Sequence, residues 1–192
     1  TCAVGPDGEP KVLFWGDSHL RALMGGVNRA ALEAQTPGLV IWHAGCPPLF
    51  GVGKTESAAT AAQDERCLAA NQRILEGLGA FSSVRQIVLV GRWTYYASGS
   101  GFGMDEHNKI ELSAAPGFGI AAQGQQALYE AAWDLTVQRL KPHFEQIHVL
   151  RQVPEMPRYD SRSVATQLAH GRATEAAVAA SLSVDDGELA GR

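Results

Sequence analysis

The stretch KVLFWGDSHLRAL, residues 11–23, joins two patterns that meet at a turn. The apolar run Lys11–Trp15 predicts a buried β-strand, and the residues from Leu20 onward have helical spacing. The Gly-Asp-Ser-His turn between them lifts Ser18 out of the sheet. We therefore expect Ser18 at the start of a helix, where the backbone is partly positive.

Three further apolar runs bounded by turn signals predict strands at Leu39–His43, Gln86–Val90 and Gln146–Leu150. All four runs are continuous rather than alternating, which is typical of strands covered on both faces in a parallel sheet. Strands that alternate with helices predict a doubly wound α/β fold, a three-layer α/β/α sandwich with a mainly parallel sheet. The helical patterns span Leu20–Gln35, Asp64–Leu78 and Ala121–Leu140.

Two regions depart from this rhythm. Thr94–Ile120 is rich in Gly, Ser and aromatic residues without a clear period, and it predicts a long loop. After Leu150 an Ala-rich, helix-like tail runs to about Leu182, and no strand follows it. Because the chain also begins without Met or a signal peptide, we expect residues 1–192 to be a single domain excised from a longer, membrane-anchored protein and truncated at its C-terminus.

The composition narrows the possible partners. With 192 residues, of which 45% are hydrophobic, the chain is large enough to bury a core. The net charge is -4 and the 16 Lys and Arg residues are scattered, so nucleic acid is not an expected partner. No window approaches the roughly 18 apolar residues of a transmembrane helix.

The three cysteines, Cys2, Cys46 and Cys67, have none of the paired spacings of a zinc site. No metal or cofactor is therefore expected. A disulfide between Cys46 and Cys67 would imply an oxidising compartment, and two buried free thiols are the alternative. Cys2 is left over in either case.

The segment PLFGVGKT, residues 48–55, is similar to a phosphate-binding loop in its last three residues. Pro48 stands where the first Gly of such a loop is required, and Pro has no backbone N–H to offer a phosphate. Nucleotide binding is therefore not expected.

The segment VLFWGDSHLRAL resembles the first block of the SGNH (GDSL-type) hydrolase superfamily. Together with His19, three later segments are similar to the SGNH domain fused C-terminally to membrane acyltransferase-3 proteins, which O-acetylate O-antigen and other cell-envelope polysaccharides. The resemblance implies a flavodoxin-like fold, a periplasmic or otherwise extracytoplasmic location, and attachment to the inner membrane through the acyltransferase domain. The three segments are CPPL (Cys46–Leu49), LVGRW (Leu89–Trp93) and VLRQVPE (Val149–Glu155).

The resemblance also implies roles for individual residues. Ser18 corresponds to the nucleophile, and its backbone N–H would help to hold the oxyanion. Gly45 is the best match for the family's second oxyanion N–H. Where the third block normally has Asn, this chain has Arg92, which could replace that donor or contact a polar substrate.

The last block of the family, Asp-x-x-His, supplies the general base and the Asp that orients it. This spacing does not occur in residues 1–192, so both groups are expected outside the chain, which alone should be inactive. His19 is an unlikely base because neighbours at a helix start point to different faces. His43 and His148 are expected to be packed core residues.

Substrate contacts are expected from Asp17 and His19 in the turn. A plain helix cap is the alternative for Asp17 or Ser18, and structural capping is the alternative for His19. Aromatic rings after the third strand would line the mouth of the Ser18 cleft and stack on sugar rings. A loop that packs its own aromatics over the sheet edge is the alternative. These rings belong to Trp93, Tyr95, Tyr96 and Phe102.

The preferred function is thus an O-acyltransferase domain that carries an acyl group, expected to be acetyl, on Ser18 and passes it to a cell-envelope glycan. The same site with water as acceptor would be an esterase. A non-catalytic domain that binds or positions glycan is the hypothesis from a different class.

Overall fold

In the computed structural model, which describes residues 1–153, 155 and 160–181, the chain forms two compact units. The first comprises Thr1–Gly99 and Lys109–Gln152 and contains the sheets. The second comprises Ser100–Asn108 and the described residues from Val153 onward.

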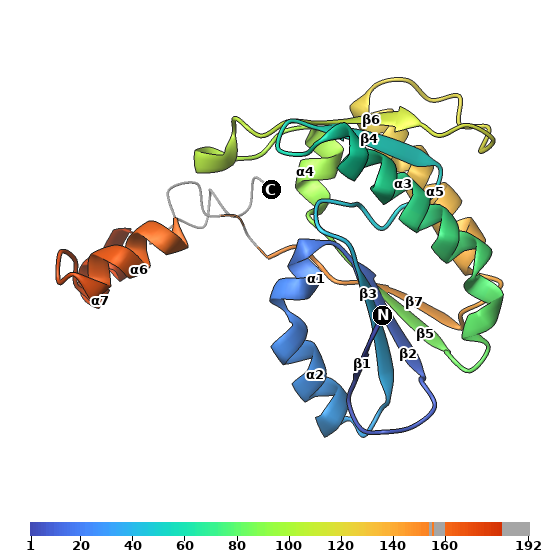
Figure 1. The fold of residues 1–192 in the computed structure, drawn as a ribbon, viewed down its shortest axis with the longest axis horizontal. Coiled ribbons are helices and arrows are strands. Elements are labelled where there is room, and N and C mark those ends of the chain that lie inside the picture. Colours follow the sequence, from blue (N-terminus) through green and yellow to red (C-terminus); the bar gives the residue numbers. More distant parts are fainter. Residues whose placement is uncertain (154, 156–159, 182–192) are drawn as a thin grey trace. The chain divides into compact units, whose positions relative to one another are not determined.

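The first unit is built on a five-stranded sheet in which four strands run parallel (Figure 1). Its order is β1-β3-β2-β5-β7, and β1 is antiparallel to its neighbour β3. The four parallel strands are those predicted from the continuous apolar runs. The bounds are β1 Cys2–Val4, β2 Val12–Gly16, β3 Gly38–Trp42, β5 Gln86–Val90 and β7 Gln146–Val149.

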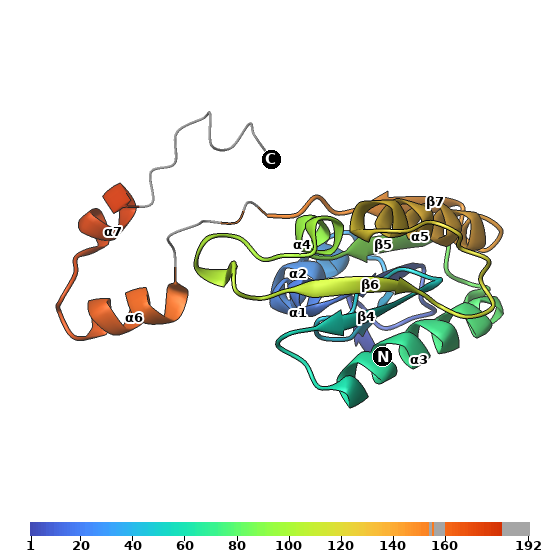
Figure 2. The same ribbon diagram turned by 90° about the horizontal axis from the view of Figure 1, so that it is seen from above.

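Helices cover both faces of this sheet, which confirms the three-layer α/β/α architecture (Figures 1 and 2). Leu13 and Trp15 of β2 face one side and pack in a core that includes residues of α3 (Ala61–Glu76) and α5 (Gln125–Leu140). Phe14 faces the other side, towards α1 (Ser18–Ala22) and α2 (Met24–Glu33). Successive strand residues point to opposite faces, so a continuous apolar run serves both cores.

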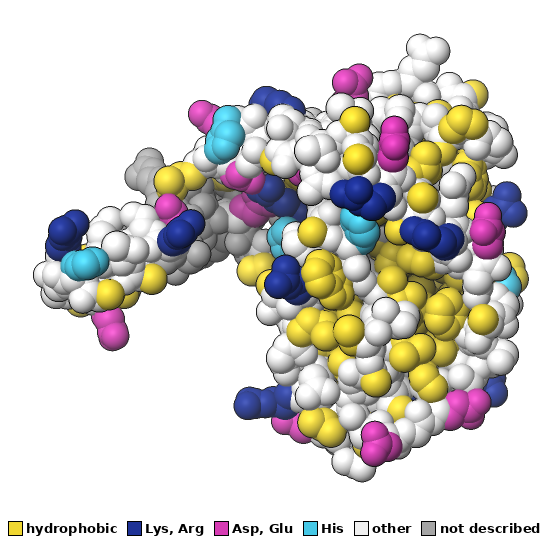
Figure 3. Space-filling model, viewed as in Figure 1, with side chains coloured by type: hydrophobic (Ala, Val, Ile, Leu, Met, Phe, Trp, Pro, Cys, Tyr) yellow, Lys and Arg dark blue, Asp and Glu magenta, His cyan; other side chains and the backbone are white. Residues whose placement is uncertain are grey.

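The core between the sheet and helices α3 and α5, here called the α3-side core, is partly exposed to solvent. Leu39, Ile41 and Ile74 pack against it but are only partly buried. Figure 3 shows hydrophobic side chains gathered on the surface between α2 and α3.

Two expectations about the elements were wrong, and one strand pair was not expected. The helix expected over 20–35 is two helices that meet at Leu23, which caps both of them. The loop expected over 94–120 contains most of α4 (Trp93–Ser98), the 3-10 turn η2 (Gly103–Asp105) and β6 (Ile110–Ala114). β6 pairs antiparallel with β4 (Val52–Glu56), so Gly53-Lys54-Thr55 of the phosphate-loop look-alike lies in a strand.

The segment after β3 is held between two helices. The predicted disulfide joins Cys46 to Cys67 of α3. The Asn71 side chain of α3 donates hydrogen bonds of 2.9 Å to the carbonyls of Pro47 and Leu49. On the other side, Thr136 of α5 accepts one from the Phe50 N–H at 2.8 Å. A 3-10 turn, η1 (Leu78–Phe81), leads from α3 to β5.

The described part of the second unit contains η2 and two helices, α6 (Ser161–Ala169) and α7 (Glu175–Ser181). The Asp160 side chain caps α6 by accepting hydrogen bonds from two backbone N–H groups of its first turn. The expected helix-like tail is thus two helices separated by residues 170–174, and its expected end at about Leu182 lies outside the described residues. Among all described residues, no helix is both long enough and apolar enough to cross a membrane.

Candidate active site

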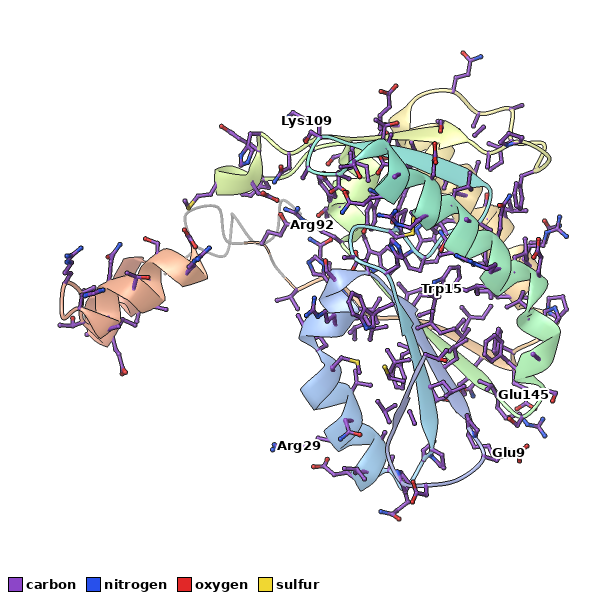
Figure 4. All side chains as sticks on the ribbon, viewed as in Figure 1. Glu9, Trp15, Arg29, Arg92, Lys109 and Glu145 are labelled. Carbon is purple, nitrogen blue, oxygen red and sulfur yellow. A yellow bond between two sulfur atoms is a disulfide. The ribbon has the colours of Figure 1, made fainter. Side chains whose placement is uncertain are left out.

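Three neighbouring strands bring the candidate site residues together at the carboxyl ends of the parallel strands. β2 lies between β3 and β5, so the chain leaves β2 for one neighbour and later returns to the other. At the carboxyl end of β2, Gly16 pairs with Trp42 on one side and with Val90 on the other. Open α/β sheets bind ligands at such a switch point. Within three residues of these strand ends follow Ser18, Gly45 and Arg92, and Figure 4 shows Arg92 at the end of the sheet where α1 begins.

Gly16 lets the turn approach β5. A Cβ atom on this residue would collide with the Val90 carbonyl oxygen. The same carbonyl accepts a hydrogen bond of 3.2 Å from the Asp17 N–H. The turn is therefore held against β5 by a contact that only glycine permits.

Asp17 joins the turn to two other segments. Its side chain is only 1% exposed. Oδ1 accepts a hydrogen bond of 2.7 Å from the His19 N–H, which makes Asp17 the cap of α1. Oδ2 accepts hydrogen bonds from the Arg92 N–H at 2.9 Å and from the Tyr96 hydroxyl at 2.6 Å. The expected contact between Asp17 and substrate is corrected, because a buried carboxylate with three donors has no free face.

These contacts set the protonation states of Asp17 and Tyr96. Burial alone would raise the pKa of the Asp17 carboxyl, but the adjacent His19 side chain and its charge, the Tyr96 hydroxyl and the Arg92 N–H together lower the pKa below its ordinary value. Burial and the Asp17 charge raise the pKa of Tyr96 well above its ordinary value. At neutral pH the site therefore holds an ionised Asp17 and a protonated Tyr96.

Ser18 is the first residue of α1 and is exposed. Within the described part of the chain, neither its hydroxyl nor its N–H has a hydrogen-bond partner. Both groups are thus available to a ligand at the sheet edge.

The imidazole of His19 lies against Asp17 and is about one-third exposed. Its Nδ1 atom is 3.3 Å from Asp17 Oδ1, yet the geometry makes no hydrogen bond, and Nδ1 has no other partner among the described residues. The expected contact between His19 and substrate stays a prediction.

The two strand-associated histidines are less buried than expected. His43 is half-buried just beyond β3, where its N–H donates to the Gly16 carbonyl at 3.1 Å. His148 is exposed, because β7 is an edge strand of the sheet and three of its four residues are exposed. The expected core packing of His148 is therefore wrong.

Gly45 has a backbone conformation that favours glycine, with φ +62°. A Cβ atom here would also lie 2.8 Å from Glu56 Oε2. In the described part of the chain its N–H has no hydrogen-bond partner. Gly45 follows β3 and Ser18 follows the neighbouring strand β2, so a free N–H at Gly45 suits its expected oxyanion role.

The backbone and the side chain of Arg92 make different contacts. Its N–H is already bound to Asp17 and is not available to an oxyanion. Its guanidinium lies over the ring of Tyr95, 4.6 Å from the ring centroid, in a cation–π contact. Any oxyanion or substrate contact of Arg92 must therefore come from the side chain.

The aromatic rings expected to stack on a sugar are core residues. Trp93, Tyr95 and Tyr96 are 9%, 3% and 1% exposed, and all three belong to the α3-side core. Trp93 packs against Trp133 at 5.1 Å between ring centroids. The expected stacking on a glycan is thus corrected in favour of internal packing. Phe102 is 45% exposed and belongs to the second unit.

A buried charged cluster next to Gly45 had no clear signal in the sequence. Lys54 Nζ lies 2.7 Å from Glu56 Oε2 and 2.6 Å from Asp64 Oδ1. The Tyr95 hydroxyl donates a hydrogen bond of 3.1 Å to Glu56 Oε1. Residues two apart share a strand face, so Lys54 and Glu56 would have been paired had β4 been recognised.

Trp42 was also missed as a feature of the sheet edge. It is half-buried, and the guanidinium of Arg21 lies 5.0 Å from the centroid of its ring. Arg21 follows Ser18 by three residues in α1, so the two share one side of the helix.

In the described residues, no three His, Cys, Asp or Glu side chains lie close enough together to hold a metal ion.

A family model described as the SGNH domain (fused to AT3 domains) matches residues 1–190 of the chain. No curated protein and no solved structure matches the chain.

Proposed function

The chain belongs to the family of SGNH domains fused to AT3 domains, and from this premise we propose that it is an O-acyltransferase domain with Ser18 as its nucleophile. The family is one of hydrolases and acyltransferases. The single observation that carries the proposal is the exposed Ser18 hydroxyl at the switch point of the sheet, on the family's Gly-Asp-Ser turn.

The proposed reaction has two steps. Ser18 Oγ attacks the carbonyl carbon of an acyl donor, its proton passes to a general base, and the donor's leaving group departs to leave an acyl-serine ester. A hydroxyl of the acceptor then attacks this ester, and its proton returns Ser18 to the free alcohol. Residues 1–192 contain no Asp-x-x-His. The proposal therefore assigns the general base to a His outside these residues.

The oxyanion formed in each step is assigned to backbone donors that are free within the described residues. These are the N–H groups of Ser18 and Gly45, which follow the ends of neighbouring strands. Donors already held in place stabilise developing charge without reorganisation. The Arg92 guanidinium is assigned as a cationic neighbour of the same position, because the chain lacks the family's Asn there.

The acceptor in this proposal is a cell-envelope polysaccharide, and the acyl group is acetyl. The AT3 domains to which the family is fused would supply the acyl group from the membrane. The Cys46–Cys67 disulfide supports a periplasmic location, since disulfides persist in oxidising compartments.

A non-catalytic glycan-binding domain is the second candidate. Two observations favour it, namely Arg92 in place of the family's Asn and the lack of Asp-x-x-His in residues 1–192. An esterase is the third outcome of the same chemistry, with water in place of the glycan hydroxyl.

The experiment compares Ser18→Ala with wild type in the full-length protein, by measuring polysaccharide O-acetylation and acetate release. Ser82→Ala is the matched control, because Ser82 is also exposed but caps a 3-10 turn outside the site. The proposal expects glycan acetylation to be lost in Ser18→Ala alone. Acetate release without glycan acetylation would indicate an esterase, and unchanged acetylation in Ser18→Ala would leave the binding module as the better account.

A further inference from the structure

We infer that Glu56 is a positioning residue for the reaction proposed above, on which this inference rests. Its carboxylate contacts the turn that carries the Gly45 N–H and, through Tyr95, sets the place of the Arg92 side chain. One residue of the two-stranded β4–β6 sheet would thus align two of the three groups assigned to the oxyanion.

The first contact is with Gly45. Glu56 Oε2 occupies the space beside the Gly45 Cα, which is why a Cβ there would come within 2.8 Å of this oxygen. The turn on the other side of Gly45 is fastened by the disulfide at Cys46. The Gly45 peptide is therefore held from two directions.

The second contact passes through Tyr95. The other oxygen, Glu56 Oε1, accepts the hydrogen bond from the Tyr95 hydroxyl, and the face of the same ring lies under the Arg92 guanidinium. A hydroxyl fixed at one end of the ring limits how the ring can tilt. The cation that lies on its face is limited with it.

Glu56 is itself held rigidly. Its side chain is 14% exposed, and Lys54 Nζ lies between Glu56 and Asp64. The Glu56 N–H donates to Asp64 Oδ2 at 3.3 Å, and strand pairing aligns Glu56 with Ile110 of β6. Lys54 also offsets the negative charge that Glu56 would otherwise present near a developing oxyanion.

A purely structural ion pair would need only the Lys54–Asp64 contact, which already ties β4 to α3. The contacts of Glu56 with Gly45 and Tyr95 are additional, and they lead to two groups assigned to the reaction, to Gly45 directly and to Arg92 through the Tyr95 ring. A double-mutant cycle on kcat can therefore separate the positioning effect of Glu56 from its effect on stability.

The experiment measures acetyl transfer by the full-length protein carrying Tyr95→Phe, Arg92→Ala or both, with Ser18→Ala in parallel. We expect Tyr95→Phe to lower kcat about tenfold, since small misplacement of a catalytic group is costly, and to change KM less than about twofold. In the Arg92→Ala background the same change should alter kcat less than about twofold. Tyr129→Phe, a half-buried tyrosine in α5, is the matched control and should retain wild-type kcat.

Equal losses from Tyr95→Phe in both backgrounds would overturn the inference, as would an Arg92→Ala protein with full kcat. If Tyr95→Phe does not fold, Glu56→Gln takes its place in the cycle. Its loss of kcat should be smaller in the Arg92→Ala background but should not vanish, because the contact of Glu56 with Gly45 does not involve Arg92. Transfer that depends on Ser18 but shows additive losses removes the positioning role alone. Transfer that is unchanged in Ser18→Ala removes the proposed function and this inference with it.

Discussion

The hydroxyl of Tyr96 donates a hydrogen bond of 2.6 Å to Asp17 Oδ2, across 79 residues of sequence. The same oxygen accepts the Arg92 N–H, and Oδ1 caps the helix that begins at Ser18. The turn after β2 and the turn after β5 are therefore tied through one buried carboxylate. This tie sets the position of Ser18 more directly than any contact of Ser18 itself.

Asp17→Asn should destabilise the protein and flatten its response to acid. Because the pKa of Asp17 is lower in the folded than in the unfolded chain, its contribution to stability is full above the unfolded pKa. That contribution is lost as the pH falls below about 4 and through the lower folded pKa. Asn cannot accept all three hydrogen bonds, so the free energy of unfolding at pH 7 should fall by about 2 to 3 kcal/mol.

Urea unfolding of wild type and Asp17→Asn, repeated at intervals of about one pH unit from about pH 2 to pH 7, measures the pH dependence of the free energy of unfolding. Asp134→Asn, which changes an exposed aspartate of α5, is the control and should keep the wild-type pH dependence. An Asp17→Asn protein with the same slope as wild type would argue against an ionised, hydrogen-bonded Asp17.

Tyr96→Phe should shift the acid response without removing it. The loss of one donor to Asp17 raises the folded pKa of that carboxyl, so acid unfolding should begin at a higher pH than in wild type. At pH 7 the free energy of unfolding should fall by about 1 to 2 kcal/mol. The midpoint of acid unfolding, followed by circular dichroism, is the measurement, and an unmoved midpoint would contradict the coupling of Tyr96 to Asp17.

Strands buried on both faces were predictable, whereas the small sheet was not. The continuous run QIVLV of β5 carries its own signal, but VGKTE of β4 is polar and acquires strand structure only by pairing with β6. β1 is only three residues long and is likewise set by its partner. Non-local pairing of this kind leaves no period in the sequence.

In the candidate site too, features set by local sequence were predictable and contacts between distant segments were not. Ser18 at a strand-to-helix turn follows from local sequence, and so does the capping role left open for Asp17. The partners of Asp17, Tyr96 and Arg92, come from a distant segment. The aromatic run at Trp93–Tyr96 was assigned to a cleft because a short helix of six residues gives too little period to show which way its rings point.

Removal of the disulfide should cost about 3 kcal/mol in the free energy of unfolding, because the Cys46–Cys67 bridge closes a loop with a sequence separation of 21. The double variant Cys46→Ser with Cys67→Ser should show this loss in urea unfolding. Cys2→Ser should show none, since Cys2 is exposed and free. In the denatured wild-type chain, thiol titration should find one free thiol, and three would exclude the bridge.

Gly45→Ala should impair transfer more than its backbone strain explains. Gly119→Ala is the matched control, because Gly119 has a similar φ of +69° but open space where its Cβ would lie. Each change should cost about 1 to 2 kcal/mol in stability from the left-handed backbone. Only Gly45→Ala adds a collision with Glu56, so it alone should lower kcat, by about tenfold. Equal kcat values in the two variants would exclude a catalytic role for the Gly45 turn.

The central claim is that Ser18 is an activated nucleophile. The most direct test treats the full-length protein with a serine-directed fluorophosphonate and compares wild type, Ser18→Ala and Ser82→Ala by intact mass. The account predicts one covalent adduct in wild type and Ser82→Ala, and none in Ser18→Ala. A folded wild-type protein that gains no adduct, or a Ser18→Ala protein that still gains one, would contradict it.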